Sequence, residues 1–237
     1  YVHTLQMIDV ATGWSERVAV FGRSQRAMEA GFCRIQARVP FRILEIHPDN
    51  GSEFLNAHLV RYFREIVQVP ALSRSRPYQK NDNRFVEQKN HTLVRDWFGD
   101  ARFDTRAHQR LLDELYDQMW RYYNFFQPVL RLNEKEWRGE GMSKHCYRKW
   151  GEAQTPFERL CATKTIDEPT QVRLRAQRDA INPRQLRAEI YRRREQLFDL
   201  PLAQRPEDSW LISDEGELET ACASPKVLSA LTGAALP

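Results

Sequence analysis

The stretch VHTLQMIDVATGWSERVAVF, residues 2–21, sets the start of the fold. Two runs of apolar and β-favouring residues, 2–10 and 16–21, flank the turn-forming triplet Ala11-Thr12-Gly13. This arrangement predicts a β-hairpin. The class of the fold then depends on which elements follow the hairpin along the chain.

Helical and strand periodicities alternate after the hairpin. In chain order, we expect a helix capped by Ser24 and running to about Arg38, a strand over residues 42–46, a helix from Ser52 or Glu53 to about Gln68, and a short strand over residues 71–73. This order predicts an α/β fold whose sheet begins antiparallel and continues through helical crossovers.

The sequence is mainly helical from Arg84 onward. Helices are expected from Arg84, over residues 105–126, over about 170–180 and over 184–198, whereas residues 129–168 are irregular, aromatic and basic. We therefore divide the chain into an α/β core at residues 1–100, a helical and irregular region at 101–198, and an acidic, mostly disordered tail at 199–237.

The net charge of +4 hides an asymmetry along the chain. Residues 199–237 hold two basic and seven acidic residues, a net charge of −5, so residues 1–198 carry +9. Of the 36 basic residues, 29 are arginines, whose planar guanidinium group suits phosphate. The charge therefore favours a polyanionic partner, although a genome rich in arginine codons explains the composition almost as well.

Composition excludes several classes of protein. With 41% hydrophobic and 29% charged residues, the chain is neither fibrous nor wholly disordered. No stretch approaches the length of about 18 apolar residues that a transmembrane helix needs, and the first residues lack the layout of a signal peptide. We therefore expect a cytoplasmic protein with no membrane partner. The four cysteines are scattered without a C-x-x-C pair, which favours isolated reduced thiols over a structural metal.

Two motifs carry the candidate functional residues. The first, HPDNGSEF at residues 47–54, places Asp49 at the carboxyl end of a core strand, the edge where α/β sheets bind ligands and ions. The second, RPYQKNDNRFVEQKN at residues 76–90, delivers Glu87 onto a helix rich in cations, which suits a site that binds both metal and phosphate. Two simpler interpretations stay open: Asp49 as a turn residue before Asn-Gly, and Glu87 as a solvated helix acid paired with His91.

In this order the two motifs resemble the second and third acidic motifs of DDE transposases and retroviral-type integrases. Thirty-seven residues separate Asp49 from Glu87, close to the interval usual in that family. The segments Tyr122-Tyr123-Asn124, Phe126-Gln127-Pro128 and Thr155-Pro156 also resemble insertion-sequence transposases, so the resemblance covers about residues 1–160. It implies a ribonuclease-H-like core, an α/β fold with a mixed sheet and flanking helices.

The resemblance also implies a metal-dependent reaction on DNA. Asp49 and Glu87 are then catalytic residues and ligands of Mg²⁺ or Mn²⁺, the cofactor of phosphodiester cleavage and strand transfer in DNA transposition and integration. The expected DNA partners are transposon ends and target, the expected assembly is a homodimer or higher oligomer, and the expected location is the nucleoid. Cations around Glu87 are expected to hold DNA phosphates: Arg74, Arg76, Lys80, Arg84, Lys89 and Arg95.

The first of the family's three carboxylates has only a superficial counterpart, Asp9 in Asp9-Val10-Ala11-Thr12. In the family it lies on the first strand of a three-stranded meander, whereas only two strands precede the helix at Ser24. Asp9 falls on the second strand by this count, and we interpret it as a turn-forming acid. The first strand and its aspartate are then missing from this chain, which is expected to bind metal weakly and to have little strand-transfer activity.

Two other functions stay open at this stage. One is a non-catalytic DNA-binding remnant of a transposase. The other is a ribonuclease-H-like nuclease that acts on structured nucleic acid.

Overall fold

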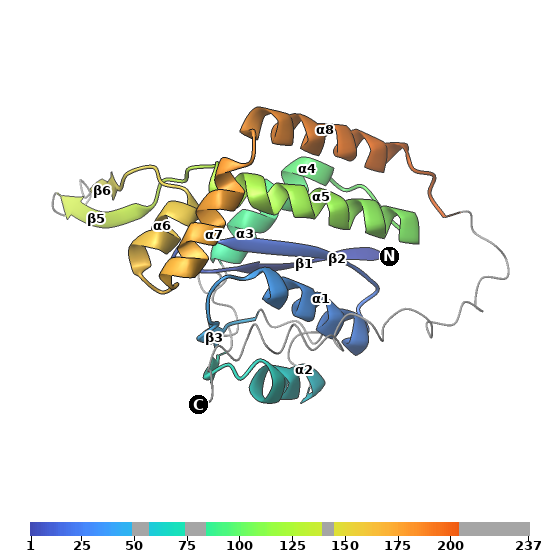
Figure 1. Cartoon of the computed structure of the whole chain (residues 1–237), viewed down its shortest axis with the longest axis horizontal. Helices are drawn as coiled ribbons and strands as arrows, with labels where there is room; N and C mark the ends of the chain where they lie inside the picture. The colour runs from blue at the N-terminus through green and yellow to red at the C-terminus, as the bar shows by residue number, and fades with distance from the viewer. Residues whose placement is uncertain (49–56, 74–83, 139–144, 204–237) are drawn as a thin grey trace. The chain divides into compact units, whose positions relative to one another are not determined.

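The computed structural model describes residues 1–48, 57–73, 84–138 and 145–203. Helices and strands alternate along the chain (Figure 1), which confirms the mixed α/β class. The chain divides into two compact units, one formed by Tyr1–Ile8, Glu16–Tyr116 and Arg192–Pro237, the other by Asp9–Ser15 and Asp117–Tyr191. The domain boundaries after residues 100 and 198 stay predictions, and most of the predicted tail, from residue 204, lies outside the described residues.

The chain begins with the predicted hairpin. Strands β1 (Val2–Ile8) and β2 (Ser15–Phe21) form a two-stranded sheet. The amide of Asp9 donates to the carbonyl of Trp14, and the amide of Gly22 donates to the carbonyl of Tyr1, so the strands are antiparallel. Helix α1 (Gln25–Arg38) follows, and the hydroxyl of its cap Ser24 accepts a hydrogen bond from the amide of Ala27. Hairpin and helix are both confirmed.

A helical crossover joins two short parallel strands. Strand β3 (Glu45–Ile46) pairs with β4 (Ala71–Leu72) in parallel, with Glu45 opposite Ala71 and Ile46 opposite Leu72. Between them lie helix α2 (Ala57–Arg61) and a π-helical turn, η1 (Tyr62–Ile66). The crossover is confirmed, but β3 is shorter than the predicted strand at 42–46 because β4 offers it only two residues to pair with. The predicted start of the crossover helix lies outside the described residues.

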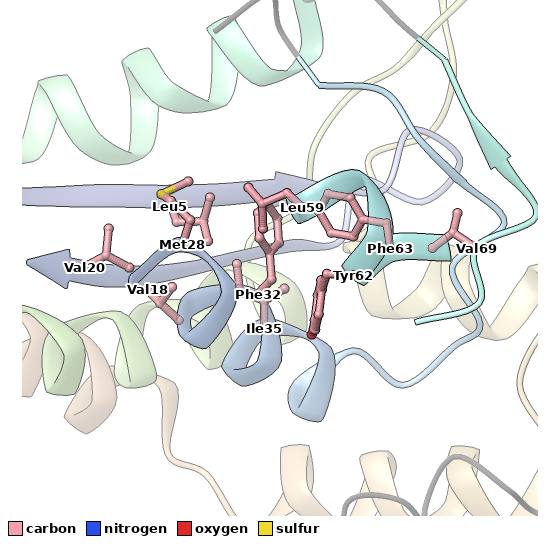
Figure 2. Packing of buried hydrophobic residues seen from close by; sticks show 10 residues of the cluster. All are labelled: Leu5, Val18, Val20, Met28, Phe32, Ile35, Leu59, Tyr62, Phe63 and Val69. Atoms are coloured by element: carbon pink, nitrogen blue, oxygen red, sulfur yellow. The ribbon is translucent and has the colours of Figure 1, made fainter. Parts of the chain in front are cut away.

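Ten buried apolar residues join the hairpin to this crossover (Figure 2). They come from both hairpin strands, from α1 and from the segment between α2 and β4: Leu5, Val18, Val20, Met28, Phe32, Ile35, Leu59, Tyr62, Phe63 and Val69. The rings of Phe32 and Phe63 meet edge to face with their centroids 4.8 Å apart. Since burying one such side chain stabilises a fold by about 1.5–3 kcal/mol, this cluster is the main force that holds the two pairs of strands together.

Helix α1 approaches the hairpin most closely at Gly31. A Cβ atom at this position would lie 2.8 Å from Cγ1 of Val20 and 2.9 Å from Cδ2 of Leu5. Both distances are well below the roughly 3.5–4.0 Å at which carbon atoms pack. The missing side chain of Gly31 therefore sets the distance between helix and strands.

Further helices belong to the first unit. Helix α3 (Arg84–Asn90) lies against β1 and continues as a π-helical turn, η2 (His91–Arg95), and as α4 (Asp96–Phe98). The first part of helix α5 (Arg106–Phe125) covers the hairpin face opposite α1 (Figure 1): the hydroxyls of Tyr116 and Thr4 are 2.6 Å apart. Burial raises the pKa of Tyr116 to about 12, so this hydroxyl keeps its proton at neutral pH.

One expectation about the second unit was wrong. Within residues 129–168, predicted to be irregular, strands β5 (Leu132–Arg138) and β6 (His145–Trp150) pair antiparallel, and helix α6 (Pro156–Thr163) follows. Both faces of this ribbon carry polar and aromatic side chains, so the alternation of apolar and polar residues that reveals most strands is absent. Helices α7 (Glu168–Asp179) and α8 (Pro183–Asp199) confirm the two basic helices predicted there.

None of the helices in the described ranges has both the length and the apolar character needed to cross a bilayer.

We expect Gly31→Val to lower the free energy of unfolding by about 2–3 kcal/mol, because the added methyl groups overpack the contact between α1 and the hairpin. Ala37→Val, at an exposed position of the same helix, is the matched control and is expected to cost only about 0.5 kcal/mol through helix propensity. Urea unfolding followed by circular dichroism measures both values. Equal, small losses would contradict the close approach at Gly31.

Candidate metal and nucleic-acid site

The carboxyl ends of β3 and β4 lie at one edge because the strands are parallel. Just beyond them, Nδ1 of His47 is 2.7 Å from Oγ of Ser73, and the Ser73 hydroxyl donates to the carboxylate of Glu45. A serine hydroxyl has one hydrogen, so His47 donates the Nδ1 proton in the bond to Ser73. These bonds fix the chain two residues before Asp49, which itself lies outside the described residues.

Glu87 lies on helix α3 and its carboxylate is exposed to solvent. The sequence suggested that His91, one turn later, pairs with it. In the structure Nδ1 of His91 is instead 3.1 Å from Oδ1 of Asp96. The π-helical turn η2 explains this difference: its wider turn, closed by a bond from the amide of Asp96 to the carbonyl of His91, brings those two residues together.

The predicted phosphate-binding cations are only partly described. Lys89, on α3, is half-buried, and Arg95, at the end of η2, is exposed. Arg84 is the first residue of α3, but its side chain is not among the described parts of the chain. Arg74, Arg76 and Lys80 lie outside the described residues altogether. The structure thus brings Glu87, Lys89 and Arg95 onto one helical segment, the continuous run from α3 to η2.

Asp9 has a structural role in the hairpin turn. Its Oδ2 accepts hydrogen bonds from the amide and the hydroxyl of Thr12, at 2.7 and 2.5 Å, and its carbonyl accepts one from the amide of Gly13. Gly13 has φ of 82°, a left-handed conformation that favours glycine. These contacts confirm that Asp9 is a turn-forming acid.

Two segments that resemble transposases also have structural roles in the second unit. Asn124 is fully buried: its amide oxygen accepts from the backbone amide of Ser15, and its amide nitrogen donates to the carbonyl of Ser15, both at 3.0 Å. Thr155 caps helix α6 through a reciprocal pair of bonds with Glu158. Buried packing and backbone hydrogen bonding therefore account for Asn124, and helix capping accounts for Thr155.

The described residues contain no group of three or more His, Cys, Asp or Glu side chains that are close enough to share a metal ion. Among the described cysteines, Cys33, Cys146 and Cys161 form no disulfide, and Cys222 lies outside the described ranges.

The sequence analysis missed one set of exposed side chains in the second unit. Lys135, Trp137, Arg148 and Trp150 lie on the β5–β6 ribbon, where the register pairs Lys135 with Arg148 and Leu132 with Trp150. The signal in the sequence was weak: aromatic and basic residues alternate with acidic ones, and alternation of that kind is easily mistaken for a charged loop.

Comparison with known proteins adds one relative. No family model matches the chain. A protein of Sinorhizobium fredii (strain NBRC 101917 / NGR234), described as "Uncharacterized protein y4rM", is 37% identical over 135 residues, which is 57% of this chain. The chain spans 38% of the length of that relative, whose description names no activity.

We expect Asp9→Ala to lower the free energy of unfolding by about 1–2 kcal/mol, because it removes the acceptor of two hydrogen bonds in the turn. Asp9→Asn, which keeps an oxygen acceptor, should lose less than half as much. Glu152→Ala, at an exposed acid of the second unit, serves as the control and should change little. Urea unfolding measures all three, and an Asp9→Ala variant as stable as the unaltered chain would contradict the role of Asp9 in the turn.

Proposed function

We propose that this chain is the ribonuclease-H-like catalytic core of a DDE transposase or integrase and lacks the first strand of that core. Its reaction is metal-dependent phosphodiester cleavage and strand transfer, and the chain alone is inactive. The observation that carries the proposal is the order of elements: an antiparallel hairpin, a helix, a parallel strand pair with a helical crossover, and then a helix that presents Glu87.

The separation of the strands into two pairs supports a core that is one strand short. The strand pairs β1–β2 and β3–β4 pack on the same apolar cluster, yet these four strands form two sheets instead of one. One additional strand between β1 and β3 would complete a single mixed sheet.

The hydrogen bonding of β1 agrees with such a strand. Tyr1 bonds to Gly22 and Asp9 bonds to Trp14, just beyond the two ends of β2. By the alternation of an antiparallel pair, the odd-numbered residues of β1 then direct their backbone groups toward β2, and the even-numbered residues direct theirs away from it. On that outer edge of β1 the amide of Val2 donates to the carbonyl of Phe103. Among the described strands, β2 alone pairs with β1, so no described strand pairs with this outer edge. Unpaired edges of this kind accept further strands.

The donor chemistry of Asp49 and Glu87 fits Mg²⁺ or Mn²⁺, because these hard ions prefer carboxylate oxygens. When bound, the ions activate the attacking hydroxyl and stabilise the leaving oxygen. Asp49, which follows β3 along the chain, would hold the metal together with Glu87 of α3, and Lys89 and Arg95 would position phosphates near Glu87. Two carboxylates, with Asp9 engaged by the turn, bind divalent ions weakly in the presence of the DNA backbone charge.

The partners follow from the reaction. Transposon ends and target DNA are the substrates, and joining two ends requires at least a dimer. The engagement of Asp9 in the hairpin turn favours a second candidate, a non-catalytic DNA-binding remnant, because it leaves the chain without a third carboxylate.

The experiment compares this chain with a longer protein that includes the residues encoded in frame upstream of Tyr1. Both are incubated with labelled transposon-end DNA and Mg²⁺ or Mn²⁺. We expect the longer protein to cleave and join DNA and the shorter chain to give little product. In the longer protein, Glu87→Gln should lower the rate by about a thousandfold or more, whereas Glu65→Gln, at an exposed acid of η1, should leave it unchanged.

The remaining outcomes separate the alternatives. Salt-sensitive DNA binding without products from either protein, or a stop codon directly upstream of Tyr1, would indicate the non-catalytic remnant. Hydrolysis without joining would indicate a nuclease. Robust joining by the shorter chain, lost in both Asp9→Asn and Asp49→Asn, would show that the site is complete and that Asp9 is catalytic.

A further inference from the structure

The β5–β6 ribbon has two faces of different character. In an antiparallel pair, directly opposite residues share a face and successive residues alternate between faces. The register pairs Glu134 with Lys149, Glu136 with Tyr147 and Arg138 with His145; we call this the paired face. The other face, which we call the open face, carries Lys135 opposite Arg148 and Trp137 opposite Cys146; Trp150 follows on this face of β6 and lies opposite Leu132, across an irregularity of the register between Leu132 and Glu134.

The charges of the paired face are satisfied within the ribbon. Lys149 lies 3.9 Å from the carboxylate of Glu134, and Arg138 lies 2.8 Å from that of Glu136. The guanidinium of Arg138 also sits 5.0 Å from the ring centroid of Tyr147. The hydrogen bond from Arg138 lowers the pKa of Glu136, so this carboxylate stays ionised at neutral pH. The paired face therefore presents little net charge to a ligand.

The open face presents positive charge and aromatic surface. Lys135 and Arg148 lie directly opposite each other, and like charges in this position destabilise a ribbon unless an anion lies over them. Trp137 and Trp150 are 59% and 52% exposed. None of the described residues of this face is a carboxylate. Two cations between two exposed indoles match an anionic ligand that also has flat apolar surfaces.

Nucleic acid with unpaired bases has both properties. Its phosphates attract Lys135 and Arg148, and its bases stack on indole rings in a way that does not depend on sequence. Cys146, opposite Trp137, and Trp150 are four residues apart on β6, so the two indoles are about 13 Å apart along the ribbon at about 3.3 Å per residue. A duplex hides the faces of its bases, which favours a single strand.

We propose that the open face of the β5–β6 ribbon binds single-stranded DNA, with Trp137 and Trp150 as stacking platforms and Lys135 and Arg148 on the intervening phosphates. This inference goes beyond the proposed catalytic function, since it requires neither Asp49 nor Glu87.

The test measures binding of the full chain to a labelled short homothymidine oligonucleotide by fluorescence anisotropy. Trp150→Leu is expected to weaken binding about tenfold, because one stacked base contributes about 1–3 kcal/mol on alanine substitution. Trp150→Phe, which keeps an aromatic ring, should restore most of the affinity. A merely structural role for Trp150 would not distinguish Leu from Phe in binding while both variants fold normally by circular dichroism.

A pair of double variants tests the charges of the two faces. Lys135→Gln with Arg148→Gln removes two cations from the open face, and Arg138→Gln with Lys149→Gln removes two from the paired face. Each double variant lowers the net charge by two, so the change in long-range attraction of DNA is the same for both, and the second also removes the partners of Glu134 and Glu136. A loss that is about tenfold or more for the open face and less than about threefold for the paired face supports the proposal.

Three results would overturn the proposal. Equal losses from the two double variants would show that binding follows net charge. Tighter binding of a matched duplex than of the single strand would assign the face to double-stranded DNA. No measurable binding of the oligonucleotide at low salt, with the ribbon folded, would leave the face as a protein contact.

Discussion

The contact between helix α1 and the β1–β2 hairpin is the constraint on which the first unit depends. At Gly31 the helix comes so close that a single added carbon would meet Val20 and Leu5. This closeness lets Phe32 and Ile35 of the same helix reach the residues of the crossover, Tyr62 and Phe63 among them, and form one apolar cluster with the hairpin (Figure 2). The positions of the parallel strands, and of the strand end that precedes Asp49, follow from this packing.

The same packing leaves a strand edge without a described partner. The strand pairs β1–β2 and β3–β4 share a core but form two sheets. This pattern agrees with the proposal that the core lacks one strand and with the structural role of Asp9 in its turn. It explains why a chain with two acidic motifs in the right order is expected to hold metal only weakly. The ribbon of the second unit then suggests a DNA contact that is independent of metal.

Most of the fold could be predicted where one periodicity dominated. The hairpin, helix α1 with its Ser24 cap, helix α5 and helices α7 and α8 have apolar residues at strand or helix spacing, or clear capping residues. The β5–β6 ribbon was not predicted because both of its faces are exposed. Its apolar residues therefore show neither the two-residue period of a strand nor the 3.6-residue period of a helix. The pairing of His91 with Asp96 depends on a π-helical turn, which has no reliable sequence signal. Within the candidate site, the sequence correctly placed Glu87 on a helix. The expectation that Glu87 and Asp49 lie close enough to share a metal ion rests on the family resemblance.

The central claim is that Asp49 and Glu87 form one divalent metal site. A crystal structure of the longer protein, which includes the residues encoded in frame upstream of Tyr1, grown with Mn²⁺ and with the ion located by its anomalous scattering, tests this most directly. The account predicts an ion bound by carboxylate oxygens of both Asp49 and Glu87, at about 2.1 Å. Carboxylates that lie too far apart to share an ion, with Mn²⁺ bound elsewhere or not at all, would contradict it.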